Sequence, residues 1–540
     1  MSKDQDRAFF GHPAGLSTLF FTEMWERFSY YGMRAFLMFY MTRSVALGAR
    51  GMSDVTAGLV IGLYTSSVYL LSLPGGWIAD RFLGQRKAVT YGGIGIMLGN
   101  VLLAVPGIDL FYPGLALAAI GTGLLKPNVS TIVGQLYTPD DSRREAGFTI
   151  YYMGINIGAF IAPLICGFIV DSATFRGMLK DIGINPNYAW QVAFGVVALG
   201  MLLGLVQYVL GQHRMGEAGA HPTVPSDPAR AARDRNVLGA IVGGLAIIAI
   251  LCILFQDSLS ESLISNVFPV ILLVISVALF YGLYHSSRDA NERRRVLAMI
   301  PLFLGAIAFF GIFEQASSTL NLFAERNTTP SFLGFMEPSY YQSVNSVFII
   351  ALAPAFAWLW VALGRKKKEP SSVNKFGIGM VLIAVAIAVM LPTLASEKAG
   401  VITDGPLKGH FKETVSGGYL VALYFFYTCS ELCISPVGLA SMSRLAPARL
   451  AGMVMGTWFL AASIGNFIAG QAAGFSATRG HAFLYTTIII TSGIVAAALF
   501  AVNPMIRRML AANDHAHGPA DKSEKAEPEP LPEARTIPQE

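Results

Sequence analysis

The chain has 540 residues, of which 54% are hydrophobic and only 14% are charged, and its formal net charge is +5. Soluble domains carry about 25% charged residues, so the composition excludes a soluble protein and predicts an all-α polytopic membrane protein. The positive charge lies between the apolar runs, which indicates membrane topology and gives no support to nucleic-acid binding. Cys429 and Cys433 lie in an apolar run without a histidine, so packing is expected of them and no metal site.

Fourteen apolar runs are long enough to cross a bilayer, which takes about 20 residues per helix. In chain order they are 15–42, 54–79, 87–105, 113–136, 146–170, 189–210, 237–255, 265–284, 297–323, 340–363, 375–392, 417–442, 449–475 and 481–505. The polar start, Met1–Pro13, leads directly into the first run, so no cleavable signal peptide is expected.

The runs group into two sets of six, at 15–210 and 297–505, with an additional transmembrane hairpin and its connection at 237–296. Residues 1–14 are expected to be a cytoplasmic N-terminus, and 211–236, rich in Gly, Pro, His and Arg, a cytoplasmic linker. Residues 506–540 predict a disordered cytoplasmic tail. Two six-helix bundles around a central site form the architecture of major facilitator transporters.

The loops predict how the chain is oriented. One set of loops holds about 20 basic residues and the opposite set about nine, and cytoplasmic loops carry the excess of Lys and Arg. The set with more basic residues is therefore assigned to the cytoplasm, which places both termini inside the cell.

The first apolar run carries charged side chains at membrane depth. At about 100° of rotation per residue, Glu23, Glu26, Arg27, Tyr30 and Arg34 fall within an arc of about 100° on one helix face. An ionisable group at that depth costs roughly 3 kcal/mol or more, so it persists only beside a partner or a water-filled path. The stripe predicts the wall of a solute and proton pathway.

The remaining intramembrane charges are Lys126, Glu314 and Glu431. Together with the first run they make four carboxylates and three cations, which predicts three acid–base pairs and one carboxylate left over as a proton carrier. None of the eight histidines lies in the interior of a run, since His481 stands at the very start of the last one, so the proton relay is assigned to carboxylates.

A short peptide is a zwitterion and needs a cationic and an anionic pole on facing walls. Arg27 and Lys126 in the N-terminal half can hold the carboxylate, and Glu431 in the C-terminal half can hold the amine. The side chains expected to complete the substrate site are Tyr30, Tyr31, Arg34, Tyr69, Asn156, Asn345 and Trp458. Their amides can bridge to the peptide, and their flat aromatic rings tolerate varied side chains.

Several motifs carry a family resemblance. The loop Gly75-Gly76-Trp-Ile-Ala-Asp80-Arg81 with the basic residues after it resembles the facilitator-superfamily loop that locks adjacent helix ends. Glu23-x-x-Glu26-Arg27-Phe-x-Tyr30-Tyr31-Gly32 resembles the first-helix motif of the proton-dependent oligopeptide transporter (POT) family. Further elements of the same family resemblance are Phe148–Gly158, Gly121–Asn128, Phe313-Glu314-Gln315, Glu431–Leu439 and Gly456–Leu460.

This resemblance covers roughly residues 15–505 and implies proton-coupled symport of di- and tripeptides, with no enzymatic activity and no cofactor besides the proton. It implies coupling residues Glu23, Glu26, Arg27, Arg34 and Glu314, and gate residues Arg34, Glu314, Lys126, Glu431, Asp80 and Arg81. The extra hairpin resembles that of bacterial members, so a monomer in a bacterial inner membrane is expected. Asn345-Ser346 and Ala462 depart from the family pattern, which leaves the shape of the peptide pocket open.

Three other functions remain as alternatives. A relative with the same fold could move nitrate or another small organic anion, although such a site would not need Glu431 facing a cationic pole. Carboxylates also bind sodium, so sodium coupling is a second alternative. An intramembrane enzyme is disfavoured because the interiors of the apolar runs lack histidine, and Asp80 lies at a run's end.

Overall fold

The computed structural model describes residues 7–106, 110–138, 141–222, 227–254, 261–329, 333–402, 410–445 and 451–516. Within these ranges the chain consists of helices and connecting turns, with isolated bridges and no strand, which confirms the all-α class. Eleven helical stretches among the described residues are long and apolar enough to cross a membrane. Helix α1, which carries four charged side chains, is not one of them.

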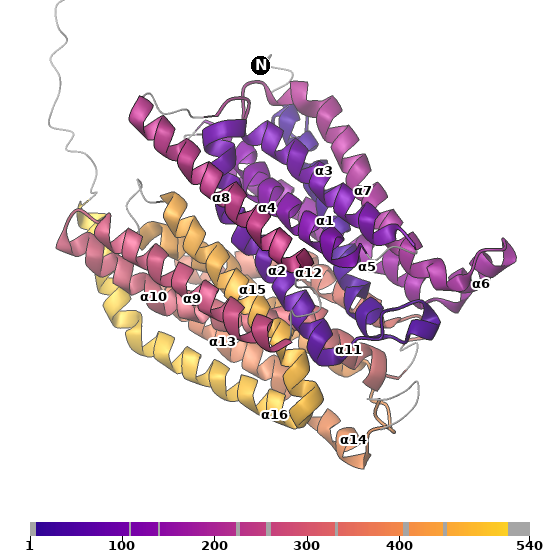
Figure 1. The fold of residues 1–540 in the computed structure, drawn as a ribbon. Coiled ribbons are helices and arrows are strands. Elements are labelled where there is room, and N and C mark those ends of the chain that lie inside the picture. Colours follow the sequence, from indigo (N-terminus) through magenta and orange to yellow (C-terminus); the bar gives the residue numbers. More distant parts are fainter. Residues whose placement is uncertain are drawn as a thin grey trace, which may run out of the picture.

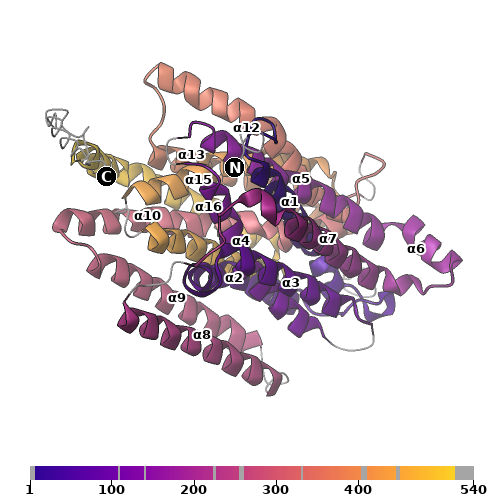
Figure 2. The same ribbon diagram turned by 90° about the horizontal axis from the view of Figure 1, so that it is seen from above.

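The helices form two halves, which Figure 1 separates by colour along the chain. The N-terminal half contains α1 (Ala14–Thr42), α2 (Asp54–Ile78), α3 (Gln85–Ala104), α4 (Phe111–Gln135), α5 (Arg144–Asp171), α6 (Ala173–Asp181) and α7 (Ala189–Gly211). The C-terminal half contains α10 (Ala290–Phe313), α11 (Thr319–Asn327), α12 (Tyr341–Arg365), α13 (Ser372–Ala388), α14 (Leu394–Ala399), α15 (Gly418–Leu445) and α16 (Ala451–Ala516). Between them α8 (Pro228–Leu254) and α9 (Glu261–His285) make the additional hairpin, at the edge of the bundle in Figure 2.

These helices overlap all fourteen predicted runs, with two differences inside the C-terminal half. Helix α16 covers the last two runs, and Gly480 separates them with a φ of 80°, a left-handed conformation that favours glycine. The predicted run 297–323 is interrupted after Phe313, where the 3-10 turn η5 (Glu314–Ser317) leads into α11.

At the interruption, side chains donate hydrogen bonds to backbone carbonyls. Tyr427 donates its hydroxyl to the carbonyl of Ile312 at 3.2 Å, and Ser317 donates to that of Glu314 at 3.1 Å. Apolar sequence shows where a helix crosses the membrane, but such a break depends on these tertiary partners.

Two boundaries differ from expectation. Helix α8 begins at Pro228, inside the predicted linker 211–236, and α16 continues to Ala516, past the predicted start of the tail at residue 506. The rest of that tail, 517–540, lies outside the described residues. The start of the linker lies against the N-terminal half, since Arg86 Nε donates to the carbonyl of Ala218 at 2.7 Å.

The contacts between the two halves include a cluster at one end of the helices. We call this end the Arg43 face, because it carries Arg43 directly after α1 and the connection from α11 to α12. Near it, α2 and α16 approach so closely that a Cβ atom at Gly470 would lie 2.4 Å from the carbonyl oxygen of Gly58. Farther along the same helices, the hydroxyls of Ser66 and Ser463 lie 2.7 Å apart.

Candidate functional site

The charged stripe of α1 is buried, as its helical spacing predicts. Glu23, Glu26, Arg27 and Arg34 are each at most 4% exposed. The Nε atom of Arg27 lies 2.8 Å from Glu23 Oε1 and 2.7 Å from Glu26 Oε2. Glu23 lies four residues before Arg27 on the same helix face, and Glu26 is the residue directly before it, so one guanidinium serves two carboxylates of its own helix.

Arg34 joins the two halves. Its Nη2 atom donates to Glu314 Oε2 and to Ser317 Oγ, each at 2.6 Å, and both acceptors lie on the turn η5. The guanidinium carbon of Arg34 also lies 5.3 Å from the ring centre of Tyr30. The structure therefore brings together Arg34 and Glu314, which the sequence assigned to a gate.

The charged groups of Lys126 and Glu431 each contact an uncharged side chain. The ammonium of Lys126 lies 3.7 Å from the centre of the Tyr69 ring, a cation–π contact. Asn345 Nδ2 donates to Glu431 Oε2 at 3.2 Å and to Thr428 Oγ1 at 3.0 Å.

This arrangement corrects the expected charge balance of three pairs and one spare carboxylate. Arg27 takes two carboxylates and Arg34 takes one, while Lys126 and Glu431 form no ion pair within 4 Å among the residues that the structure describes. The counting was wrong because partner choice depends on where helices lie relative to one another, which a list of charges does not contain. Lys126 and Glu431, which are both predicted gate residues, do not pair with each other in this conformation.

The other predicted site residues have more local contacts. Asn156 Nδ2 donates to the carbonyl of Tyr152 on its own helix at 3.0 Å. The ring centre of Tyr31 lies 6.0 Å from the Arg34 guanidinium, and Trp458 packs edge-to-face on Phe310 at 5.6 Å.

The loop after α2 lies in a π-helical turn, η2 (Ala79–Leu83). There Asp80 accepts a hydrogen bond from Gln85 at 2.7 Å, and Arg81 lies 3.7 Å from Asp234 of α8. These contacts connect the turn to α3 and to the additional hairpin. The gate role of Asp80 and Arg81 remains a prediction.

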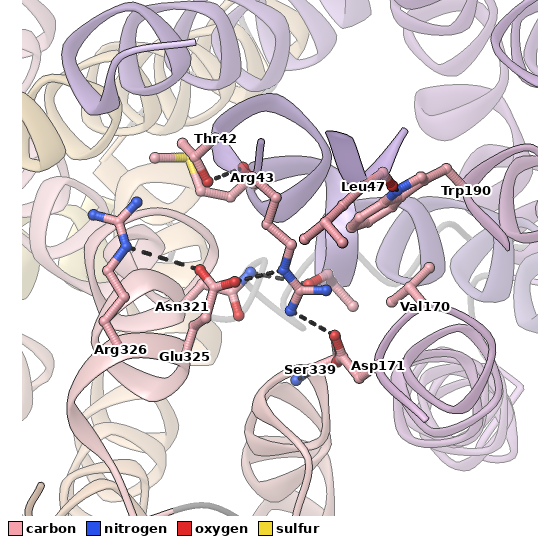
Figure 3. A network of polar contacts seen from close by, with 12 residues as sticks. Thr42, Arg43, Leu47, Val170, Asp171, Trp190, Asn321, Glu325, Arg326 and Ser339 are labelled. Atoms are coloured by element: carbon pink, nitrogen blue, oxygen red, sulfur yellow. Dashed lines mark hydrogen bonds and ion pairs between the residues drawn. The ribbon is translucent and has the colours of Figure 1, made fainter. Parts of the chain in front are cut away.

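A second polar network at the Arg43 face is shown in Figure 3. Arg43 Nη2 donates to Asp171 at 2.7 Å, and Arg43 Nε donates to Glu325 of the C-terminal half at 2.5 Å. Burial disfavours the charge of Arg43, but the two carboxylates outweigh it, so the pKa of Arg43 lies above its usual value. Asp171 also accepts from the hydroxyl of Ser339 in the C-terminal half at 2.7 Å.

The next residue of α11 adds a further link between the halves. Arg326 binds Asp54 at the start of α2 through two parallel hydrogen bonds of 2.6 and 2.8 Å. Sequence reasoning missed this network. Arg43, Asp54 and Asp171 stand at helix ends, where charges in solvated loops are common, so nothing local distinguished them.

Among the described residues, no group of three or more His, Cys, Asp or Glu side chains could hold a metal ion. The charged side chains of the site can exchange their present ion pairs and hydrogen bonds for contacts with a solute that carries a positive and a negative group.

Comparison with known proteins places this geometry in context. The pattern of the POT family matches residues 86–489. The chain is 38% identical to the peptide transporter YePEPT of Yersinia enterocolitica, over 87% of this chain and 89% of that protein. It is 37% identical to a di-/tripeptide transporter of Lactococcus lactis subsp. cremoris, over 93% and 98% of the two chains.

Solved structures agree. A crystal structure of a POT peptide transporter mutant in complex with alafosfalin is 37% identical, with a TM-score of 0.80, covering 94% of this chain and 97% of that one. A POT family transporter in complex with 5-aminolevulinic acid is 32% identical, with a TM-score of 0.81, covering 93% and 98%. Matches of this extent show that the chain belongs to the POT family of membrane transporters.

Proposed function

We propose that this protein is a proton-coupled symporter that imports di- and tripeptides by alternating access across a bacterial inner membrane. Relatives described as peptide or di-/tripeptide transporters cover nearly the whole chain. Transport explains the buried charged side chains of the site, and we propose neither a catalysed reaction nor a cofactor.

The observation that supports the proposal is that Lys126 and Glu431 both contact neutral side chains. They belong to opposite halves, have opposite charge, and rest on Tyr69 and Asn345 rather than on each other. A peptide carboxylate at Lys126 and a peptide amine at Glu431 would give each charge the counter-charge it lacks. The 5-aminolevulinic acid bound by a structural relative also carries an amino and a carboxyl group.

The proton is assigned to the carboxylates of α1 and η5. A proton on Glu314 would remove the charge that holds Arg34, and the halves could then separate at the Arg43 face. The predicted topology puts this face outside the cell, so the described conformation corresponds to a transporter closed to the outside. Peptide and proton would enter here after the halves part.

A zwitterionic peptide adds no net charge, so the proton alone couples its accumulation to the membrane potential. A potential of about 100 mV supplies about 2.3 kcal/mol for each charge moved inward.

Purified protein in proteoliposomes tests the proposal. Labelled dialanine should accumulate under an inward proton gradient or a negative internal potential, each imposed separately, and a protonophore should abolish the accumulation. A sodium gradient alone should have no effect. Accumulation of labelled nitrate instead of dialanine would favour the anion alternative and contradict the peptide assignment.

A further inference from the structure

The turn η5 interrupts the membrane helix between α10 and α11. It directs two side-chain oxygen atoms, one of Glu314 and one of Ser317, towards the same point. A 3-10 helix has three residues per turn, so side chains three positions apart point in the same direction. In an α-helix the same side chains diverge by about 60°. Glu314 and Ser317 are the first and last residues of the turn, three positions apart.

Both side chains meet the same nitrogen. Arg34 Nη2 lies 2.6 Å from Glu314 Oε2 and 2.6 Å from Ser317 Oγ. The Ser317 hydroxyl donates its hydrogen to the carbonyl of Glu314, at 3.1 Å, so the lone pairs of its oxygen remain available to the guanidinium. The serine is 3% exposed, and water therefore does not compete freely for this bond.

We propose that Ser317 is a positioning residue of the gate: it is the reserve acceptor that keeps Arg34 on the C-terminal half after Glu314 is neutralised. By this means it sets the pH at which the halves part at the Arg43 face. The inference rests on the proposed function only in that Glu314 takes up the transported proton.

The effect of losing the Ser317 oxygen depends on the other hydrogen-bond acceptors around Arg34. Its Nη1 atom lies 3.4 Å from the Tyr30 hydroxyl, a weak contact, and its Nε atom has no hydrogen-bond partner among the described residues. While Glu314 is charged, loss of the serine oxygen still leaves Arg34 an ion pair. Once Glu314 is neutral, the same loss leaves the buried cation with only an uncharged carboxyl oxygen and the long Tyr30 contact, so the closed state is weakened most at acid pH.

Other groups act on Glu314 electrostatically and stay in place when Ser317 is changed. They are Arg34, Tyr30 and Tyr31 on α1, Tyr69 on α2, Lys126 on α4 and Glu431 on α15. A change in pH response on replacing Ser317 therefore belongs to its contacts with Arg34 or with its own turn.

The experiment measures opening of the Arg43 face as a function of pH without substrate. Spin labels at Val45 and Phe335, which are exposed on opposite halves, report the distance across this face in a background without the native cysteines. Ser317→Ala should raise the open-to-closed ratio about tenfold or more at acid pH, because a hydrogen bond to a charged group is lost. For one linked proton, a tenfold change moves the opening midpoint up by about one pH unit.

Two further variants separate positioning from support of the turn. Ser317→Thr keeps the oxygen and should restore the wild-type midpoint. In an Arg34→Ala background Ser317→Ala should have no effect, because the cation it holds is gone. An unchanged midpoint in Ser317→Ala, or a shift that persists without Arg34, would overturn the proposal.

If the alanine variant does not fold, Ser317→Gly replaces it, since it also removes the hydroxyl acceptor and adds no cysteine to the labelling background. Its midpoint should also rise, and an unchanged midpoint would count against the proposal. A wild-type protein that opens with acid but does not take up dialanine would contradict the proposed substrate and leave the role of Ser317 standing.

Discussion

The ammonium of Lys126 lies 3.7 Å from the centre of the Tyr69 ring and has no ion-pair partner within 4 Å in the part of the chain that the structure describes. A cation held by an aromatic face is positioned without being neutralised, so it stays available to a negatively charged ligand. This relationship leads to the first prediction.

Lys126→Ala should abolish gradient-driven uptake of dialanine in proteoliposomes, because the peptide carboxylate loses its counter-charge. Leaving a buried charge unpaired costs roughly 3–5 kcal/mol, enough to reduce binding at least a hundredfold. Tyr69→Phe keeps the aromatic face and serves as the matched control, with uptake near the wild-type level. Wild-type accumulation by Lys126→Ala would refute the two-pole site.

Glu26→Gln should separate coupling from binding. The change keeps the size of the side chain but removes its titration, and Arg27 keeps its bond to Glu23 at 2.8 Å. Exchange of labelled for unlabelled dialanine without a gradient should survive in part, while accumulation under a proton gradient is lost. Glu145→Gln, an exposed carboxylate at the start of α5, is the control. Equal loss of exchange and accumulation would mean that Glu26 holds substrate or structure rather than protons.

Glu314→Gln should mimic the protonated state and shift the protein towards opening at the Arg43 face. Spin-label distances across that face should lengthen at neutral pH and lose most of their pH response, since the carboxylate that pairs with Arg34 at 2.6 Å is gone. Glu413→Gln changes an exposed carboxylate in the α14–α15 connection and should leave the distances unaltered. An Arg43 face that stays closed in Glu314→Gln would disprove the proposal that a proton on Glu314 opens it.

Arg43→Met should open the same face at every pH between about 5 and 9. Because the pKa of Arg43 lies above its usual value, the guanidinium that binds Asp171 and Glu325 stays charged throughout this range. The open-to-closed ratio should therefore rise by the same factor at each pH, in addition to the opening that Glu314 controls. Arg176→Met removes a neighbouring cation that donates to the carbonyl of Val170, and it should have little effect. If the factor by which Arg43→Met raises the open-to-closed ratio over the wild type changes with pH, the network itself titrates.

Gly470→Ala should prevent the halves from closing at the Arg43 face. Its Cβ atom would lie 2.4 Å from the Gly58 carbonyl oxygen and 2.5 Å from the Gly62 Cα atom, and neither backbone can yield without moving α2. Open-state distances and slower uptake are expected. At Gly474, four residues farther along α16, the nearest atom would lie 3.5 Å away, so Gly474→Ala should transport normally. Normal closure in Gly470→Ala would show that the two helices are not locked by this contact.

Much of the fold followed from the sequence. The limits of α2, α5 and α12 lie close to those of their apolar runs, because a segment that crosses hydrocarbon must be helical and about 20 residues long. The polar face of α1 followed from residue spacing alone, since every residue turns the helix by about 100°. That four of its charges are buried follows from the cost of exposing them to lipid.

Partner choice was decided only by the tertiary structure. Whether Arg34 pairs with Glu314, and whether Lys126 contacts Glu431 or Tyr69, depends on how the helices lie relative to one another, which no helical periodicity encodes. The same holds for Ser317, an unremarkable serine in an apolar run until the 3-10 turn aligns it with Glu314. Sequence determined which charges must lie inside the membrane, because burial of charge is a property of each residue. A contact between side chains of different helices is a property of both helices at once, so only tertiary packing determined the partners of Arg34, Lys126 and Glu431.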